Sequence, residues 1–353
     1  MVADPSFTAS RTNHSRFILM MARTSSACLT LFDVITDERG ETSIPGTAVL
    51  SLHKHSAQTG GLAFVCGVYG WIGAGGGEVR EASALLPYFL AINMVFEIKL
   101  NGTVVTTGGN RGIGLAISKA CAQAGANVAI LYHSNPDAEK TAEEVAKEYG
   151  VKVKAYKCDV SDAELVKKTI QQAESELGQI TGLAANAGVS IVKPALELTP
   201  EDFHKVFNVN VLGVFNACKS VAQHWVETGF EKGSIVVTSS MSSEIYNQKG
   251  PNDPLTQVFY NASKGAATNM VKGLAAEFAK YKIRVNALEP GFCNTEQTSV
   301  MDKTIRDYQA SSVPMGRFSE PHEQGAPCVF LLSEYASYMT GGHIRPDGGF
   351  TVW

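Results

Sequence analysis

The sequence lacks paired cysteines. Seven cysteines occur among 353 residues, and none forms a Cys-x-x-Cys pair or stands in a Cys/His cluster. Neither a disulfide framework nor a zinc site is therefore expected, and we predict no bound metal. Scattered free thiols of this kind suit a reducing compartment.

An excess of either charge is also absent. The formal net charge is −4 at pH 7, with 44% hydrophobic and 18% charged residues. This balance is typical of a globular protein with a substantial core. Because no strongly basic segment stands out, we expect neither nucleic acid nor an anionic membrane as a partner.

Long uninterrupted hydrophobic runs are missing as well. The apolar stretch 60–77 holds eight glycines, and the stretch 84–96 is only thirteen residues long and contains Pro87. A membrane-spanning helix needs about 20 consecutive apolar residues. We therefore expect no membrane-spanning segment.

Residues 1–96 have no clear structural assignment. Their apolar residues follow no sustained period, and residues 1–32 carry three arginines, many Ser and Thr and a single acid, Asp4. That composition loosely resembles a transit peptide, although no clear cleavage site follows. The alternatives are a real, disordered extension, a targeting segment, or a gene-model artefact with a mispredicted start. The last is favoured because the remaining sequence predicts a complete domain.

From about residue 97 onwards, strands and helices are predicted to alternate. Predicted strands lie at 103–107, 127–132, 151–156, a fourth ending at 185, 234–238, 283–288 and 343–345. Predicted helices lie at 112–124, 137–149, after a Ser161–Glu164 capping box, after a Thr199 cap, at 259–281 and at 321–333. Such alternation is typical of a parallel sheet covered on both faces. Residues 97–353 are therefore predicted to form one α/β domain, a Rossmann-type doubly wound parallel sheet of about seven strands.

A glycine-rich turn follows the first of these strands. Between Thr107 and the helix, Gly108 permits a tight bend, Gly112 lets the backbone approach a pyrophosphate, and Gly114 lets the helix pack close to the strand. The helix N-terminus offers unpaired N–H groups to phosphates. Because strand, turn and helix occur in this order, the sequence predicts a dinucleotide site.

The end of the second strand favours NADP(H) over NAD(H). NAD sites usually place an acid there to hold the ribose 2′-hydroxyl, and this chain has Tyr132 instead. Arg111 supplies a cation and Ser134 a hydroxyl for a 2′-phosphate. The alternative for Arg111 is an ordinary solvated loop residue.

Tyr260 and Lys264 are the candidate proton-transfer pair. Positions four apart share one face of a helix, so the ammonium group can lie near the phenol. A neighbouring cation lowers the pKa of a tyrosine from its ordinary value of about 10 by favouring the phenolate. Tyr260 can then give a proton to a ketone oxygen, or take it back. Taken alone, a tyrosine with a lysine four residues later is weak evidence.

Taken together, these motifs resemble the short-chain dehydrogenase/reductase family over about residues 97–353. The resemblance implies cofactor contacts from the turn residues Gly108, Asn110, Arg111, Gly112, Ile113 and Gly114. It places Asp159 and Val160 at the adenine and Asn186 beside the adenosine ribose. It lines the nicotinamide and its carboxamide with Pro290, Gly291 and Thr295.

The same resemblance completes a catalytic tetrad of Asn210, Ser240, Tyr260 and Lys264. In the family, the asparagine holds a water in a proton relay to the lysine, and the serine bonds the substrate carbonyl. The lysine also grips the nicotinamide ribose. The alternatives are that Asn186 and Asn210 satisfy turns, and that Ser239 or Ser242 takes the place of Ser240.

A long polar loop between Ser240 and Tyr260 bears on the substrate. Glu244, Asn247 and Gln257 could supply the many partners that a polyol or open-chain sugar needs, because an unpaired buried hydroxyl is costly. An ordinary solvated loop is the alternative on composition alone.

The segments 233–243, 255–264 and 339–349 are similar to fungal NADP-dependent mannitol 2-dehydrogenases and sorbose reductases. This resemblance implies a cytoplasmic homotetramer, joined through helices near 202–229 and 259–281, that interconverts a ketose and its sugar alcohol. The chain departs from those enzymes in its first 96 residues, in Glu289 and in Arg345-Pro346. Two alternatives stay open: a secondary-metabolite reductase acting on an apolar ketone such as a terpenoid, and a non-catalytic NADP-binding sensor.

Overall fold

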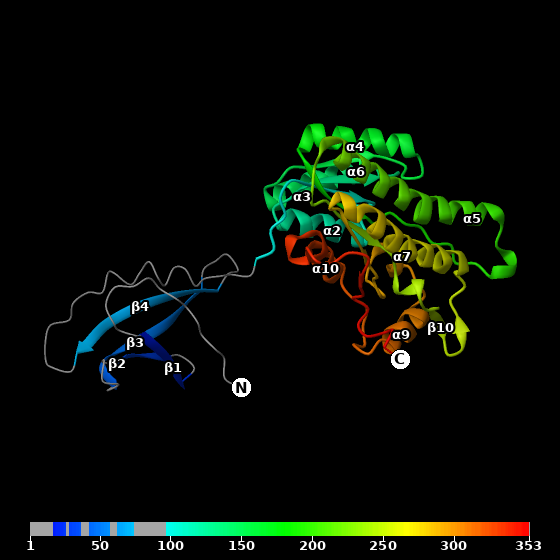
Figure 1. The fold of residues 1–353 in the computed structure, drawn as a ribbon. Helices are drawn as coiled ribbons and strands as arrows, with labels where there is room; N and C mark the ends of the chain where they lie inside the picture. The colour runs from blue at the N-terminus through cyan, green and yellow to red at the C-terminus, as the bar shows by residue number, and fades with distance from the viewer. Residues whose placement is uncertain (1–16, 26–27, 37–41, 57–61, 74–96, 353) are drawn as a thin grey trace. The chain divides into compact units, whose positions relative to one another are not determined.

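A computed structural model describes residues 17–25, 28–36, 42–56, 62–73 and 97–352 and divides the chain into two compact units, Met1–Phe96 and Glu97–Trp353 (Figure 1). The first unit contains a four-stranded antiparallel sheet in which each strand pairs with the next along the chain. Its strands are β1 (Phe17–Ser25), β2 (Cys28–Thr36), β3 (Thr42–Ser56) and β4 (Leu62–Gly73).

We predicted none of these four strands from the sequence. Their apolar residues stand in runs, as in the segment 62–73, and a search for strict alternation misses such runs. The stretch 84–96, which we considered as a membrane segment, lies outside the described residues. Of residues 1–32, whose composition loosely resembles a transit peptide, residues 1–16 and 26–27 also lie outside the described residues.

The second unit is built on the predicted seven-stranded parallel sheet. Its strands are β5 (Thr103–Thr107), β6 (Asn127–Tyr132), β7 (Val153–Lys157), β8 (Ile180–Ala185), β9 (Ser234–Thr238), β12 (Arg284–Leu288) and β13 (His343–Ile344). They lie in the order β7-β6-β5-β8-β9-β12-β13. The order reverses between β5 and β8, and the crevice at this switch point is where doubly wound sheets bind ligands.

Helices cover both faces of this sheet, which confirms the predicted doubly wound fold (Figure 1). One core cluster packs α4 (Ala163–Leu177), α6 (Val214–Thr228) and α7 (Val258–Phe278) on the sheet. The other packs α2 (Gly112–Gln123), α3 (Ala138–Tyr149) and α10 (His322–Leu332). Each face therefore buries its own apolar layer, and the carboxyl ends of the strands stay at one edge.

Of two predicted helix caps, one differs from the structure. The predicted capping box at Ser161 is wrong, because α4 begins after Asp162, whose side chain accepts from the N–H of Leu165. The Ser161 hydroxyl donates instead to Asp159. By contrast, the predicted cap at Thr199 is confirmed, with Pro200 in the first turn.

The long helix expected near 202–229 is interrupted. It consists of α5 (Pro200–Phe207), a π-helical turn (Asn208–Gly213) and α6. The loop before α7 carries a small hairpin of β10 (Gln248–Gly250) and β11 (Asp253–Pro254), and two further helices, α8 (Glu296–Ser299) and α9 (Lys303–Ser312), follow β12. No helix in the described part of the chain is long and apolar enough to cross a bilayer.

Candidate active site

The glycine turn lies at the switch point of the sheet. Gly108 and Gly112 have φ of +63° and +53°, which residues with a Cβ rarely adopt. A Cβ on Gly114 would lie 2.1 Å from the main-chain oxygen of Gly108. The helix therefore approaches the end of β5 as closely as the backbone allows.

The start of α2 leaves main-chain donors free. The N–H groups of Gly112, Ile113 and Gly114 have no hydrogen-bond partner among the described residues, and Arg111 at the N-cap makes no side-chain cap. Unpaired N–H groups at a helix N-terminus attract phosphates. The turn therefore fits a dinucleotide pyrophosphate.

Thr107 and Asn186 join the two strands at the switch point. The Thr107 hydroxyl accepts from the N–H of Asn186 and from that of Ala187, each at 2.9 Å. The Asn186 amide in turn donates to the main-chain oxygen of Thr107 at 3.2 Å. Asn186 thus holds the turn, and we had not predicted the acceptor role of Thr107, which the sequence signals only by a threonine directly before the glycines.

The side chains expected at a 2′-phosphate are exposed. Arg111 and Ser134 both lie at the surface, and the Arg111 side chain has no partner among the described residues. His133, which the sequence did not single out, places its Nε2 atom 3.7 Å from a carboxylate oxygen of Asp159.

Asp159 and Val160 follow β7. Partial burial acts to raise the pKa of Asp159, but hydrogen bonds from the Ser161 hydroxyl and N–H outweigh it and lower that pKa. Val160 is buried, and its main-chain oxygen accepts from the amide of Asn216 at 3.0 Å. Both residues therefore have fixed positions at the carboxyl edge of the sheet.

Lys264 and Tyr260 lie on one face of α7, as predicted. The Lys264 side chain is buried, with its ammonium nitrogen 5.7 Å from the centre of the Tyr260 ring and 2.8 Å from the main-chain oxygen of Thr238. Burial lowers the pKa of Lys264 to about 8. Thr238 was not predicted, because a main-chain acceptor leaves no mark in a sequence.

Ser240 is the serine that reaches Tyr260. Burial raises the pKa of Tyr260, whereas the sequence predicted that the neighbouring lysine would lower it, and the contact with Ser240 acts against burial. Ser240 also accepts from the N–H of Ser242 at 3.1 Å. Of the two alternatives, Ser239 instead bonds the Lys264 main-chain oxygen and Thr268, and the Ser242 hydroxyl accepts from Asn247.

Asn210 occupies the π-helical turn. Its amide oxygen accepts from the N–H of Val189, and its amide nitrogen donates to the Val189 oxygen and to the Ser263 hydroxyl. A Cβ on Gly188 would lie 3.4 Å from Asn210 Oδ1 and 3.5 Å from Lys264 Nζ. Asn210 and Lys264 thus both lie close to Gly188, while the Asn210 amide bonds the main chain of Val189, as the alternative role in satisfying a turn requires.

The segment after β12 runs beside the glycine turn. The Pro290 oxygen accepts from the N–H of Met241 at 3.1 Å, and the N–H of Gly291 donates to Pro346. A Cβ on Gly112 would lie 3.5 Å from the Thr295 side chain. The glycine turn, the stretch after β9, the segment 290–295 and the stretch after β13 thus meet at the carboxyl ends of the strands.

Part of the loop after Ser240 is buried and held by hydrogen bonds. Asn247 and Gln257 are buried, and the Asn247 amide nitrogen donates to the Ser242 hydroxyl at 3.1 Å. The amide oxygen of Asn247 is buried without a partner among the described residues. Glu244 is exposed and pairs with Arg345 at 2.7 Å.

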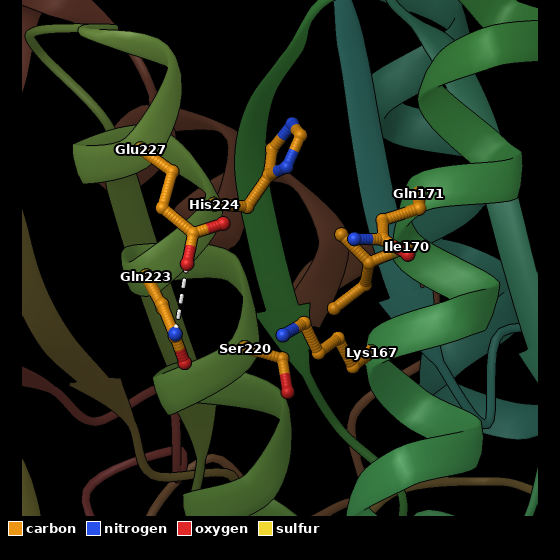
Figure 2. A pocket seen from close by; sticks show the side chains of 7 residues that line it. All are labelled: Lys167, Ile170, Gln171, Ser220, Gln223, His224 and Glu227. Atoms are coloured by element: carbon orange, nitrogen blue, oxygen red, sulfur yellow. Dashed lines mark hydrogen bonds between the residues drawn. The ribbon is translucent and has the colours of Figure 1, made fainter.

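A separate hollow lies between α4 and α6 (Figure 2). His224 and Glu227 line it from α6, Lys167 lines it from α4, and none of its lining residues is a predicted site residue. It has room for about one water molecule. It therefore cannot hold a dinucleotide or a sugar.

Comparison with known proteins covers most of the second unit. A family model described as enoyl-(acyl carrier protein) reductase matches residues 108–351, a range that includes every predicted site residue. The chain is 36% identical over 260 residues to an NADP-dependent mannitol dehydrogenase of Hypocrea jecorina, covering 73% of this chain and 95% of that one. It is 37% identical over 265 residues to a sorbose reductase of Candida albicans, covering 74% and 92%.

Among solved structures, the chain is similar to a gluconate 5-dehydrogenase of Burkholderia cenocepacia crystallised with NADP and tartrate. The TM-score is 0.66 and the identity 31%, over 73% of this chain and 98% of that one.

Proposed function

The chain belongs to the short-chain dehydrogenase/reductase family and is an oxidoreductase, and on this premise we propose that it is an NADPH-dependent reductase interconverting a ketose and its sugar alcohol. The observation that carries the reductase proposal is the meeting of Ser240, Tyr260 and Lys264 at the edge of the sheet. These groups can hold a carbonyl oxygen and give it a proton.

The chain's own residues perform the acid–base half of the reaction. A nicotinamide held beside Pro290, Gly291 and Thr295 would supply hydride to the carbonyl carbon, and the negative charge would then collect on the carbonyl oxygen. Ser240 and Tyr260 hydrogen-bond that oxygen, and Tyr260 gives it a proton. The Lys264 charge stabilises the phenolate left behind, and a water held by Asn210 would return the proton through Lys264.

Several observations support NADPH over NADH. Tyr132 stands at the end of β6, where NAD sites usually have an acid, and a carboxylate there would repel a 2′-phosphate. The exposed Arg111 side chain is available to bond that phosphate. The mannitol dehydrogenase of Hypocrea jecorina and the solved structure bear NADP in their names.

A neutral sugar fits the loop better than a sugar acid. The unpaired oxygen of Asn247 could accept from a substrate hydroxyl, which would remove the cost of leaving it bare. Within residues 241–257, all of which the structure describes, the one cation, Lys249, pairs with Asp253. The loop itself therefore offers no free cation for a carboxylate such as that of gluconate.

The proposal includes a homotetramer in the cytoplasm. Phe203, Leu212 and Phe215 are large apolar side chains exposed on α5 and its continuation, which supports association through these helices. The five cysteines described in the structure are free thiols, which suits a reducing compartment. Light scattering of the purified protein tests the assembly.

The direct test follows NADPH consumption by the purified chain. D-Fructose, L-sorbose, a pentulose and a bulky apolar ketone are each offered with NADPH and with NADH, and Tyr260→Phe serves as the control. Turnover of a ketose with NADPH alone, abolished in Tyr260→Phe, supports the whole proposal.

Other outcomes separate its parts. Turnover of the apolar ketone alone keeps the mechanism and rejects the sugar. Binding of NADPH without reduction of any carbonyl rejects the reductase and favours an NADP-binding sensor. Asn247→Ala is expected to lower kcat/KM for the ketose by about 10-fold and to leave the apolar ketone unaffected, because one hydrogen bond to the hydroxyl is lost.

A further inference from the structure

The two unusual residues near the active site, Glu289 and Arg345, bond each other. Glu289 directly follows β12 and Arg345 directly follows β13, and the N–H of Glu289 donates to the Ile344 oxygen. The guanidinium group donates to one carboxylate oxygen of Glu289 through Nε at 2.9 Å and through Nη2 at 2.7 Å. Two departures that lie far apart in the sequence are therefore a single ion pair.

Stability alone does not explain this pair. The Glu289 side chain is completely buried, and that of Arg345 is 17% exposed. A buried ion pair often adds nothing to stability compared with apolar residues of the same size, because both charges lose their hydration. A role in placing other groups is a better account.

The second oxygen of Glu289 binds hydroxyl groups from α7 and from the stretch after Ser240. It accepts from Thr268 Oγ1 at 2.9 Å and from Ser243 Oγ at 3.3 Å. An ionised carboxylate only accepts, so Thr268 must donate its single hydroxyl proton to Glu289. Thr268 Oγ1 also lies 2.7 Å from Ser239 Oγ, whose hydroxyl reaches the Lys264 main-chain oxygen at 3.0 Å, so Thr268 links Ser239 to the carboxylate.

The main chain around Ser240 is fixed by the neighbours of Glu289. The N–H of Ser239 donates to the Leu288 oxygen at 2.7 Å, and the N–H of Met241 donates to the Pro290 oxygen at 3.1 Å. Ser240 thus lies between two residues that are bonded to the main chain on either side of Glu289.

We propose that Glu289 is a positioning residue for Ser240 and that Arg345 holds it in place. The carboxylate holds the hydroxyl of Ser243 directly and that of Ser239 through Thr268, and these fix the short stretch that presents the Ser240 hydroxyl to Tyr260. Arg345 also bonds Glu244 at 2.7 Å, which ties the start of the substrate loop to the same carboxylate. This inference rests on the proposed function in one respect: Ser240 acts on the substrate carbonyl.

The test is a double-mutant cycle between Glu289→Gln and Ser240→Ala, measured on the full chain with whichever carbonyl it reduces. Glu289→Gln keeps the side-chain shape and removes the charge. We expect it to lower kcat by about 10-fold, with the KM for NADPH unchanged. In the Ser240→Ala background, the same change should lower kcat by less than about 2-fold, because the group that it positions is gone.

A general structural defect would behave differently. It would lower kcat by the same factor in both backgrounds, and that result would overturn the proposal. Glu231→Gln is the matched control, since Glu231 pairs with Lys282 in the loops before β9 and β12, at the opposite edge of the sheet. It should leave kcat unchanged.

Two further measurements cover the remaining cases. If Glu289→Gln does not fold, the double variant Glu289→Met with Arg345→Met leaves no buried charge and takes its place in the cycle. If the wild-type chain reduces no carbonyl, the proposed function has failed, and a crystal structure of Glu289→Gln tests the positioning alone. Loss of the bond from the Ser242 N–H to Ser240 Oγ would support the inference, and an unchanged bond would overturn it.

Discussion

The ammonium nitrogen of Lys264 lies 2.8 Å from the main-chain oxygen of Thr238, at the end of β9. This contact holds a buried cation at the carboxyl edge of the sheet, close to the Tyr260 ring. The strand thus places the charge that the helix carries, and the cost of burying that charge has measurable consequences.

Lys264→Met is expected to stabilise the cofactor-free protein at neutral pH. The pKa of Lys264 falls from 10.5 to about 8 in the folded state, so at pH 7 the folded chain pays for a buried charge that the variant lacks. That cost is at most about 3 kcal/mol. Between pH 8 and 10.5 the unfolded chain binds more protons than the folded one, so the stability of the wild type rises with pH and the difference closes.

Urea denaturation of both proteins at several pH values from 7 to 10.5 measures this difference. Lys272→Met, at an exposed position of the same helix, is the control and should show no such trend. A stability difference that stays constant across this range, or a wild type more stable than the variant at pH 7, would contradict the prediction.

Tyr260→Phe is expected to abolish reduction while NADPH still binds. Removing a general acid lowers kcat by about 10²- to 10⁴-fold, and Tyr260 is the tyrosine whose ring lies 5.7 Å from Lys264 Nζ and contacts Ser240. Steady-state kinetics and NADPH fluorescence titration provide the two readouts. A variant that kept more than a tenth of the activity would assign the proton to another group.

Arg111→Ala together with Tyr132→Asp is expected to reverse the cofactor preference. The first change removes a charge-assisted bond to the 2′-phosphate, worth about 1.5–3 kcal/mol, and the second adds a carboxylate that repels the phosphate and can hold a ribose hydroxyl. The ratio of kcat/KM for NADPH and NADH measures the effect. Lys119→Ala, on the same helix as the glycine turn and paired with Glu148, should leave that ratio unchanged.

Gly114→Ala is expected to disrupt the turn. The added Cβ would lie 2.1 Å from the Gly108 oxygen and 2.5 Å from the Asn186 amide, so strand and helix must separate. Overpacking of this kind costs about 1–3 kcal/mol or more. The midpoint temperature of thermal unfolding and the affinity for NADPH should both fall. Gly250→Ala, whose Cβ would meet only the Asp253 Cβ at 3.7 Å, should change neither, and equal behaviour of the two variants would disprove the close packing.

Much of the second unit follows from local sequence. Apolar runs separated by helical stretches predicted all seven strands and the doubly wound arrangement, because a parallel sheet buried on both faces leaves that pattern. The turn from Gly108 to Gly114 was predictable because its backbone needs glycine. The strands β1 to β4 were not predicted, because their apolar residues follow no sustained period and no predicted helices separate them.

What the sequence determined by itself was the order of strands and helices, the glycine turn, and the spacing of Tyr260 and Lys264 along one helix face. Tertiary structure decided which groups meet across long separations: Thr238 with Lys264, Ser263 with Asn210, and Glu289 with Arg345, which are 56 residues apart. It also opened the π-helical turn that contains Asn210, where the sequence predicted one continuous helix. The physical reason is that local propensity acts within a few residues. The partner of a buried charge or amide is set only when the sheet brings the carboxyl ends of its strands together.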